Sequence, residues 1–317
     1  MESVSITNEI WHGGCMDLFA SIPDSSVDLT FADPPFNLNK KYSTYLDAVG
    51  EGAYIRWSQA WIAEMVRVTK PTGFIVIHNI PKWLVKYGWI LDLMADFLHW
   101  VTWDAPTKPM GNTLQPAHYG FLLYAKDKKQ AKIHELRYPH KRCRKSGILE
   151  KDYGGKKSGL HPFGPLLSDV WTDLHRIKHN KYRDPHPCQL PIPLMERIIL
   201  LCTNAGDMVL DPFSGTGTTA VAAKRLGRCS IGFDVDEDYV QIGRDHLAQE
   251  IAGVSRLGKS FVSVSCGKIR TIRDSDWPDL AQYFILPDDP KEIDQKEISL
   301  RSHKVVGDMI LPVKKGK

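Results

Sequence analysis

The 317-residue sequence has no long hydrophobic run and no basic-then-apolar pattern at its start. Because a membrane-spanning helix needs about 20 consecutive apolar residues, these absences predict neither a membrane segment nor a secretory leader. Six cysteines are scattered without paired spacings, which indicates reduced thiols rather than a disulfide framework. No internal repeat is present. Together these features favour a globular protein of the cytoplasm.

The chain has little excess charge of either sign overall, but its positive charge is concentrated in one block. The formal net charge is +4, with 41 Lys and Arg against 37 Asp and Glu. From Lys126 to Arg183 the sequence has sixteen Lys and Arg against six Asp and Glu, so this block carries +10 and the rest −6. A basic block in an acidic chain is typical of a protein that binds a phosphate backbone. A solvated basic face is the alternative.

Residues 206–219 predict a ligand-binding turn. An apolar strand at 208–210 leads into a Gly-rich turn and then a helix from about Thr218. Gly215 and Gly217 leave the backbone accessible, and the helix start offers free N–H groups to an anionic ligand group. A strand at 228–232 follows and ends before Asp234, where doubly wound sheets hold a ribose. The absence of G-x-G-x-x-G and of a P-loop lysine disfavours a dinucleotide or ATP. A strand-to-helix turn without a ligand is the alternative.

A second candidate site follows the strand expected at 27–32. Asp33-Pro34-Pro35-Phe36 stands at its carboxyl end, where α/β sheets bind ligands. The prolines make the turn stiff and leave its carbonyls free to accept hydrogen bonds. The Asp33 carboxylate and the Pro34 carbonyl would accept the protons of an exocyclic base amine, and Phe36 offers a stacking face. Such chemistry needs the base outside the duplex. A proline-rich turn without a catalytic role is the alternative.

Strands alternate with helices on both sides of the basic block, which predicts one mostly parallel sheet. An antiparallel pair is expected at 97–103 and 119–124, and another strand at 74–77. Residues 38–52 are expected to form a loop. The expected helices span residues 18–22, 53–69, 83–95, 191–202 and 237–249.

The motifs and their order resemble the DNA amino-methyltransferases that modify adenine N6 or cytosine N4, in the circularly permuted β-group order. In that group the Asp-Pro-Pro-aromatic motif precedes a target-recognition region, and the S-adenosyl-L-methionine motifs come last. The similar segments run over 9–125 and 186–247. The resemblance implies a class I methyltransferase fold, which is α/β, Rossmann-like and circularly permuted. It has a mostly parallel seven-stranded sheet and an inserted loop-rich recognition region.

The resemblance also implies roles for individual residues. Asp33, Pro34, Pro35 and Phe36 would form the catalytic pocket. The expected cofactor-binding residues are Cys15, Met16, Asp17, Asp33, His186, Asp211, Phe213, Gly215, Gly217, Thr218 and Asp234. The expected DNA-binding residues are Arg142, Arg144, Lys145, Arg176 and Lys178.

The sequence does not assign every wall of the expected base pocket. The family often has an acidic residue before the strand here at 121–124, whereas this chain has Tyr119-Gly120. Tyr119 and Trp103 are therefore candidates for the second wall of the base pocket. Trp57 and Trp61 are expected in the core. His175 and His179 have a spacing that zinc sites use, but no Cys-x-x-Cys pair accompanies them, so we expect no metal.

We predict four regions. Residues 1–125 form the catalytic half of a methyltransferase domain, 126–185 a basic target-recognition region, 186–252 the cofactor-binding half, and 253–317 a C-terminal appendage. The predicted activity is transfer of a methyl group from S-adenosyl-L-methionine to adenine N6 in double-stranded DNA. Cytosine N4 is the alternative target, and a catalytically silent nucleic-acid-binding protein is the alternative of another class. A homodimer and a cognate restriction endonuclease are candidate partners.

Overall fold

A computed structural model describes residues 7–38, 49–105, 114–137, 166–174, 176–177, 184 and 189–250, and the backbone of five short strands beyond residue 261. The chain divides into two compact units. Unit 1 comprises residues 1–133 and 169–255, and unit 2 comprises residues 134–168 and 256–317. Among the described residues, no helix has both the length and the apolar character needed to span a membrane.

Unit 1 is built on a mostly parallel sheet. The strand order is β1 (Asn8–His12), β9 (Cys229–Asp234), β8 (Met208–Asp211), β2 (Val27–Ala32), β3 (Thr69–Asn79), β5 (His118–Ala125), β4 (Asp96–Asp104) and β7 (Val170–Trp171). The first five strands are parallel to one another, and β5 runs antiparallel to both of its neighbours. Strands such as β2 are buried on both faces, which explains their nearly continuous apolar sequences.

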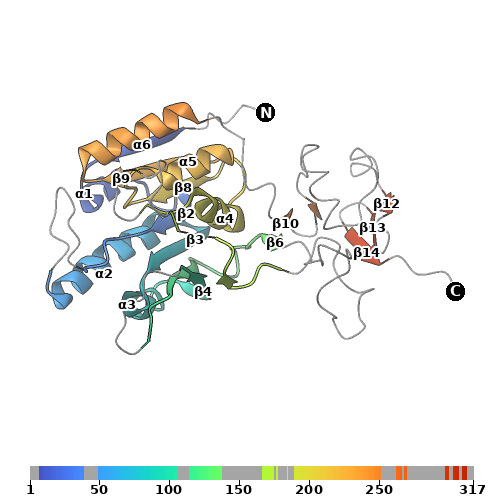
Figure 1. The fold of residues 1–317 in the computed structure, drawn as a ribbon, viewed down its shortest axis with the longest axis horizontal. Helices are drawn as coiled ribbons and strands as arrows, with labels where there is room; N and C mark the ends of the chain where they lie inside the picture. Colours follow the sequence, from blue (N-terminus) through green and yellow to red (C-terminus); the bar gives the residue numbers. More distant parts are fainter. Residues whose placement is uncertain are drawn as a thin grey trace. The chain divides into compact units, whose positions relative to one another are not determined.

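Helices cover both faces of this sheet (Figure 1). On one face α1 (Cys15–Phe19), α2 (Glu51–Val68) and α3 (Pro81–Leu91) form the main core with β2, β3 and β5. On the other, α4 (Ile192–Cys202), α5 (Thr218–Arg225) and α6 (Glu237–Gln249) pack in sequence. Strand β1 separates the two layers, because Ile10 belongs to the α5–α6 cluster and Trp11 packs against the main core.

The first strand of the chain, β1, packs against β9 and α6, which are the last strand and the last helix of unit 1. Strand β1 pairs with β9, and the Arg244 guanidinium of α6 donates to the Ile10 carbonyl at 3.0 and 2.8 Å. The Gly-rich turn between β8 and α5 therefore lies in the middle of the sheet although it occurs late in the sequence. This arrangement is the circular permutation that the motif order predicts.

Most predicted elements have the expected position. Helix α6 and strand β2 have the predicted bounds, and α2 and α4 lie within two residues of theirs. The helix expected at 18–22 was wrong, because the Gly14 carbonyl accepts the N–H groups of Asp17 and Leu18 and thereby starts α1 earlier. Residues 51–52, expected in a loop, begin α2, and residues 39–48 lie outside the described part of the chain.

The sheet contains one strand more than the seven expected. Seven strands have four or more residues, and the eighth, β7, has two. It comes from the region that the sequence predicts to be loop-rich.

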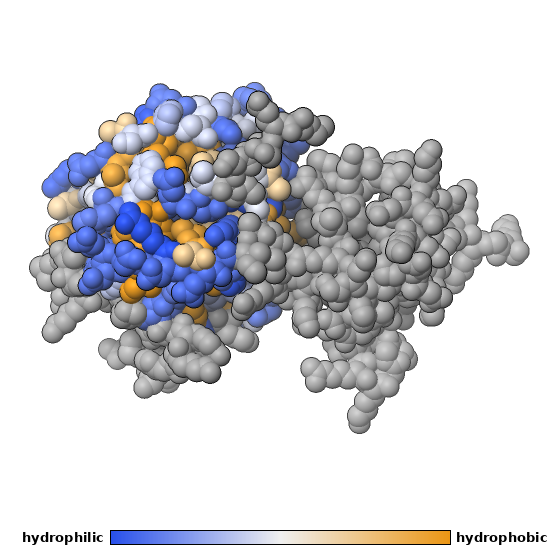
Figure 2. Space-filling model, turned by 90° about the horizontal axis from the view of Figure 1, so that it is seen from above, coloured by the Kyte–Doolittle hydropathy of each residue, from blue (hydrophilic) through white to orange (hydrophobic). Residues whose placement is uncertain are grey.

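Figure 2 shows one face of unit 1, on which hydrophilic residues surround smaller apolar patches.

Unit 2 contains two small antiparallel sheets. Strand β10 (Val262–Ser265) lies between β11 (Lys268–Ile269) and β6 (Glu135–Arg137). The second sheet contains β12 (Glu297–Ser299), β13 (His303–Val306) and β14 (Met309–Pro312). The pairing of β6 with β10 joins part of the basic block to the C-terminal segment that the sequence analysis treated separately.

Candidate active site

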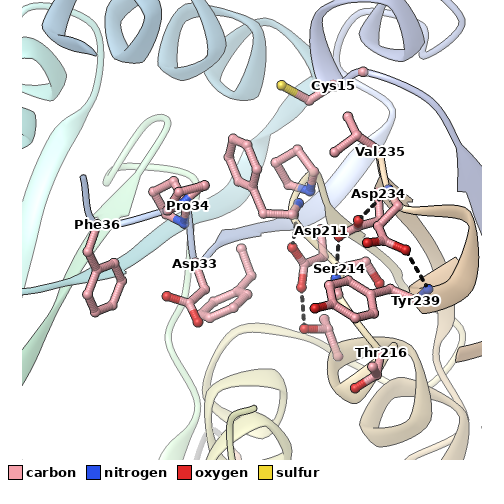
Figure 3. Close-up of a pocket in the computed structure, with 18 of the residues that line it drawn as sticks. Cys15, Asp33, Pro34, Phe36, Asp211, Ser214, Thr216, Asp234, Val235 and Tyr239 are labelled. Atoms are coloured by element: carbon pink, nitrogen blue, oxygen red, sulfur yellow. Dashed lines mark hydrogen bonds between the residues drawn. The ribbon is translucent and has the colours of Figure 1, made fainter. Parts of the chain in front are cut away.

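Both sequence motifs line one cavity of about 580 Å³ in unit 1 (Figure 3). Asp33 to Phe36 follow β2, and Asp211 ends β8. Because β2 and β8 are parallel neighbours, their carboxyl ends reach the same edge of the sheet. Two motifs about 180 residues apart in sequence are thereby brought to one site.

Two aspartates at strand ends accept hydrogen bonds from the Gly-rich turn and the start of α5. One oxygen of Asp211 accepts the Phe213 N–H at 3.0 Å and the other accepts the Thr219 hydroxyl at 2.5 Å. Asp234 at the end of β9 accepts the Gly215 N–H at 2.8 Å (Figure 3). Gly217, with a φ of 81°, precedes α5 in the left-handed region that glycine adopts without strain. The turn is therefore preformed.

The cavity concentrates negative charge. Burial raises the pKa of Asp211 to about 7, hydrogen bonds from Thr219 and Phe213 oppose this rise, and the nearby charges of Asp33 and Asp234 add to it. Burial also raises the pKa of Asp234, against the hydrogen bonds from Asp236 and Gly215. Carboxylates that are destabilised in their charged form bind a cationic ligand favourably. This arrangement fits the sulfonium and ammonium groups of S-adenosyl-L-methionine.

The Asp33-to-Phe36 turn is held by two helices. The Tyr54 hydroxyl of α2 donates to the Pro35 carbonyl, and the Trp83 indole of α3 donates to the Phe36 carbonyl at 2.7 Å. Among the described residues, none donates to the Pro34 carbonyl. The turn therefore keeps one carbonyl and the Asp33 carboxylate as acceptors, and both residues line the cavity.

A histidine missed by the sequence analysis contacts Asp33, the aspartate predicted to be catalytic. The His78 Nδ1 atom lies 2.8 Å from Asp33 Oδ1. In the sequence, His78 and Asn79 end the apolar strand β3 at the ligand-binding edge of the sheet. Polar residues in that position were the signal that could have identified it.

The structure brings most of the predicted cofactor residues together. Those that line the cavity are Cys15, Met16, Asp33, Asp211, Phe213, Gly215, Thr218 and Asp234. Asp17 and Gly217 are not among the lining residues, and His186 lies outside the described residues. Gly217 instead packs against Ile10 and Gly243, so its contribution is the shape of the turn.

Several lining residues were not predicted. They include Tyr54, Trp57, Gln189, Leu190 and Tyr239. Trp61 is fully buried as predicted, but Trp57 is only partly buried and lines the cavity, with its ring 5.6 Å from that of Phe213. The two tryptophans share the apolar face of α2, and only the position of the cavity distinguishes them.

The predicted recognition residues are mostly outside the described part. Arg142, Arg144, Lys145 and Lys178 belong to that group, as do His175 and His179. The Arg176 guanidinium lies 5.3 Å from the Tyr119 ring, and this ring lies 5.9 Å from Phe36. Trp103 is buried and donates to the Leu174 carbonyl at 2.7 Å, and neither Trp103 nor Tyr119 is among the residues that line the cavity.

The family model for DNA methylases that modify N6 or N4 amino groups matches residues 27–245. This chain therefore belongs to the DNA methylase family. The match includes both motifs of the cavity and confirms the predicted family, and the solved structures that share the sheet architecture confirm the class I methyltransferase fold.

This DNA methylase is similar to several type II methyltransferases. It is 38% identical over 255 residues to M.BamHI of Bacillus amyloliquefaciens, and the match covers 80% of this chain but 60% of that relative. It is 35% identical over 239 residues to M.HpaI of Haemophilus parainfluenzae, covering 74% and 72% of the two chains. The chain thus spans less than two thirds of M.BamHI.

Solved structures share the fold of this methylase. TTHA0409 of Thermus thermophilus, solved with S-adenosyl-L-methionine, has a TM-score of 0.54 at 23% identity, and the match covers 78% of this chain and 96% of that one. The cytosine-N4-specific PvuII DNA methyltransferase has a TM-score of 0.55 at 16% identity, with 91% and 93% covered. At these identities the similarity concerns the fold alone.

Proposed function

We propose that this protein transfers the methyl group of S-adenosyl-L-methionine to the N6 amino group of an adenine flipped out of double-stranded DNA. The observation that carries the proposal is the shared cavity of the Asp33-to-Phe36 turn and the Gly-rich turn after β8. The type II relatives support a role in restriction and modification. A homodimer and a cognate restriction endonuclease remain candidate partners.

The residues of the cavity suit the parts of the cofactor. Asp234 would hold the ribose hydroxyls, because each carboxylate oxygen retains acceptor capacity beyond its one backbone bond. Asp211 and Phe213 would hold the methionine part, and Cys15 and Met16 would lie near the adenine. Burial raises the pKa of Cys15 to about 12, which keeps this thiol neutral and unreactive.

The chain contributes positioning and acceptors to the transfer. The bound cofactor supplies a methyl group already activated on a sulfonium. Asp33 and the Pro34 carbonyl accept hydrogen bonds from the target amine, which frees its lone pair to bond to the methyl carbon. The methyl–sulfur bond breaks with its electron pair left on sulfur, and the surplus amine proton passes through Asp33 to solvent. Phe36 offers a face for the flipped base. Catalysis therefore rests on orientation and preorganised charge rather than on a covalent enzyme intermediate.

The distribution of charge supports DNA as the substrate. The residues of unit 2 include 20 Lys and Arg against 12 Asp and Glu, a net charge of +8, which leaves −4 for unit 1. Some cations of the predicted basic block are structural, since the Lys126 ammonium donates to the Thr69 carbonyl at 2.6 Å and burial lowers its pKa. The phosphate-binding charge is therefore expected on unit 2.

The test is to identify the methylated base. The purified protein is incubated with unmethylated genomic DNA and methyl-labelled S-adenosyl-L-methionine, and the DNA is digested to nucleosides. We expect label in N6-methyladenine and none with Asp33→Ala. Label in N4-methylcytosine would move the target and keep the mechanism, whereas cofactor binding without label in DNA would contradict the proposed activity.

A further inference from the structure

We propose that His78 is a positioning residue that holds the carboxylate of Asp33 in its catalytic orientation. The proposal rests on the proposed function, because it concerns the acceptor of the target amine. The register of the sheet places the two residues side by side. Ala32 of β2 pairs with Ile77 of β3, so the next residue of each parallel strand is Asp33 or His78.

His78 lies behind Asp33 and outside the cavity. Its side chain is 3% exposed, against 12% for Asp33, and it is not among the residues that line the cavity. Asp33 therefore stands between the cavity and the imidazole. A hydrogen bond from behind to Oδ1 leaves Oδ2 able to accept from a substrate amine.

The imidazole is enclosed by aromatic rings. Its ring centre lies 4.7 Å from Phe121, 5.4 Å from Tyr119 and 6.0 Å from Trp103. The Nε2 atom is buried, and within the described residues it has no hydrogen-bond partner. An aromatic residue without polar atoms would avoid this unsatisfied nitrogen, which typically costs about 1–3 kcal/mol. The bond from Nδ1 to Asp33 is thus the polar contact that accounts for a histidine here.

The chemistry of this contact determines its direction. An ionised carboxylate accepts hydrogen bonds and donates none, so the proton lies on Nδ1 of His78. This bond restricts rotation of the Asp33 carboxylate. His78 also contacts the other end of the motif, since the Phe36 ring centre lies 5.7 Å from the imidazole. One buried side chain therefore braces both the acceptor and the aromatic residue of the catalytic turn.

Three substitutions separate positioning from packing. His78→Asn places an amide N–H near the position of Nδ1, His78→Gln places it near that of Nε2, and His78→Leu removes the donor. We expect kcat to fall about 10- to 100-fold in the Leu and Gln variants and less than about fivefold in the Asn variant. The KM for S-adenosyl-L-methionine should change little in all three, and the melting temperatures of the Asn and Gln variants should be similar to each other, because both place one amide in the same buried site. Full activity of the Leu variant, or equal losses with Asn and Gln, would overturn the proposal.

A second measurement does not depend on catalysis. Long-range ¹H–¹⁵N spectra of the full-length protein, with the His78 signals assigned from their absence in His78→Asn, report which ring nitrogen carries the proton. We expect a protonated Nδ1 whose shift changes in Asp33→Ala. A protonated Nε2 with a bare Nδ1 would refute the contact. If the spectra show the contact but the wild-type protein methylates no base, the proposed activity fails and not the contact.

Discussion

Asp211 has opposite consequences for stability and for ligand binding. Its folded-state pKa of about 7 lies above its ordinary value of 3.8, so the folded protein binds this proton more tightly than the unfolded chain. The contribution of Asp211 to stability therefore declines as the pH rises from about 4 through 7. The buried negative charge of Asp211 destabilises the ligand-free protein, and a bound cationic ligand would offset this destabilisation.

We expect Asp211→Asn to raise the free energy of unfolding of the ligand-free protein by about 1–3 kcal/mol at pH 8, an advantage that shrinks toward pH 4. Urea unfolding over this pH range measures it. Calorimetric affinity for S-adenosyl-L-methionine should fall at least about tenfold. The exposed Asp245→Asn is the control, with no change expected in either measurement. Unaltered affinity in Asp211→Asn would show that the cofactor does not use this charge.

Gly217 combines two constraints that can be separated. Its φ is 81°, and an added Cβ would lie 2.7 Å from Ile10 Cδ1 and 3.1 Å from Gly243 Cα. Gly206 has a φ of 85° but no atom within 4 Å of such a Cβ. Gly206→Ala therefore isolates backbone strain, for which about 1–2 kcal/mol is expected.

Gly217→Ala should lose about 1–3 kcal/mol more than Gly206→Ala, because it also overpacks the junction of β1 and α6. The two free energies of unfolding, measured by chemical denaturation, decide this. Equal losses in the two variants would mean that Ile10 and Gly243 move aside without penalty.

At the scale of elements, α2 and α3 hold the turn from Asp33 to Phe36, in which we propose catalysis takes place. The Tyr54 hydroxyl donates to the Pro35 carbonyl and lies 2.7 Å from the Tyr87 hydroxyl. Because the Tyr54 proton is used for Pro35, Tyr87 is the donor between the two phenols. Burial raises the pKa of Tyr87 to about 12, so it remains a neutral donor at physiological pH.

Tyr54→Phe should lower kcat about tenfold by releasing the Pro35 carbonyl, with little change in cofactor affinity. Tyr87→Phe removes a neighbouring hydroxyl and leaves the Pro35 contact in place, so a change below about threefold is expected. Steady-state methylation rates compare the two. A larger loss in Tyr87→Phe would show that the pair of phenols, rather than the bond to the turn, supports activity.

At the scale of the whole molecule, unit 1 is acidic and unit 2 is basic. The cavity proposed to bind the cofactor lies in unit 1, where carboxylates from three neighbouring strand ends, Asp33, Asp211 and Asp234, line it. The net charge of +8 belongs to unit 2, which contains the C-terminal segment as well as part of the basic block. Cofactor binding and DNA binding should therefore respond differently to salt.

DNA affinity should fall roughly 500-fold between 50 and 200 mM salt if about five phosphates are neutralised. Fluorescence anisotropy with a mixed-sequence duplex measures this slope. The affinity for S-adenosyl-L-methionine, measured by calorimetry in the same buffers, should change much less. A shallow slope for DNA would argue against phosphate contacts by the basic unit.

Several of the local elements of unit 1 follow from the sequence alone. Periodicity predicts α2, α4, α6 and β2 closely, because each buries a regular apolar face. The two motifs were also recognisable, since stiff prolines, glycines and acids after strands have few other uses together. The boundaries of α1 and β3 depended on hydrogen bonds and strand pairing that periodicity does not report.

Which distant residues meet depended on the packing and pairing of the elements in three dimensions. His78 became a neighbour of Asp33 through the register of β2 and β3, and Trp57 came to line the cavity through the packing of α2. The pairing of β6 with β10 likewise joins segments more than 120 residues apart. Local periodicity and residue type were enough to predict the long, regularly patterned elements and the chemistry available at their ends. The composition of the site depended on sheet order and register, which arise from contacts between residues far apart in the chain.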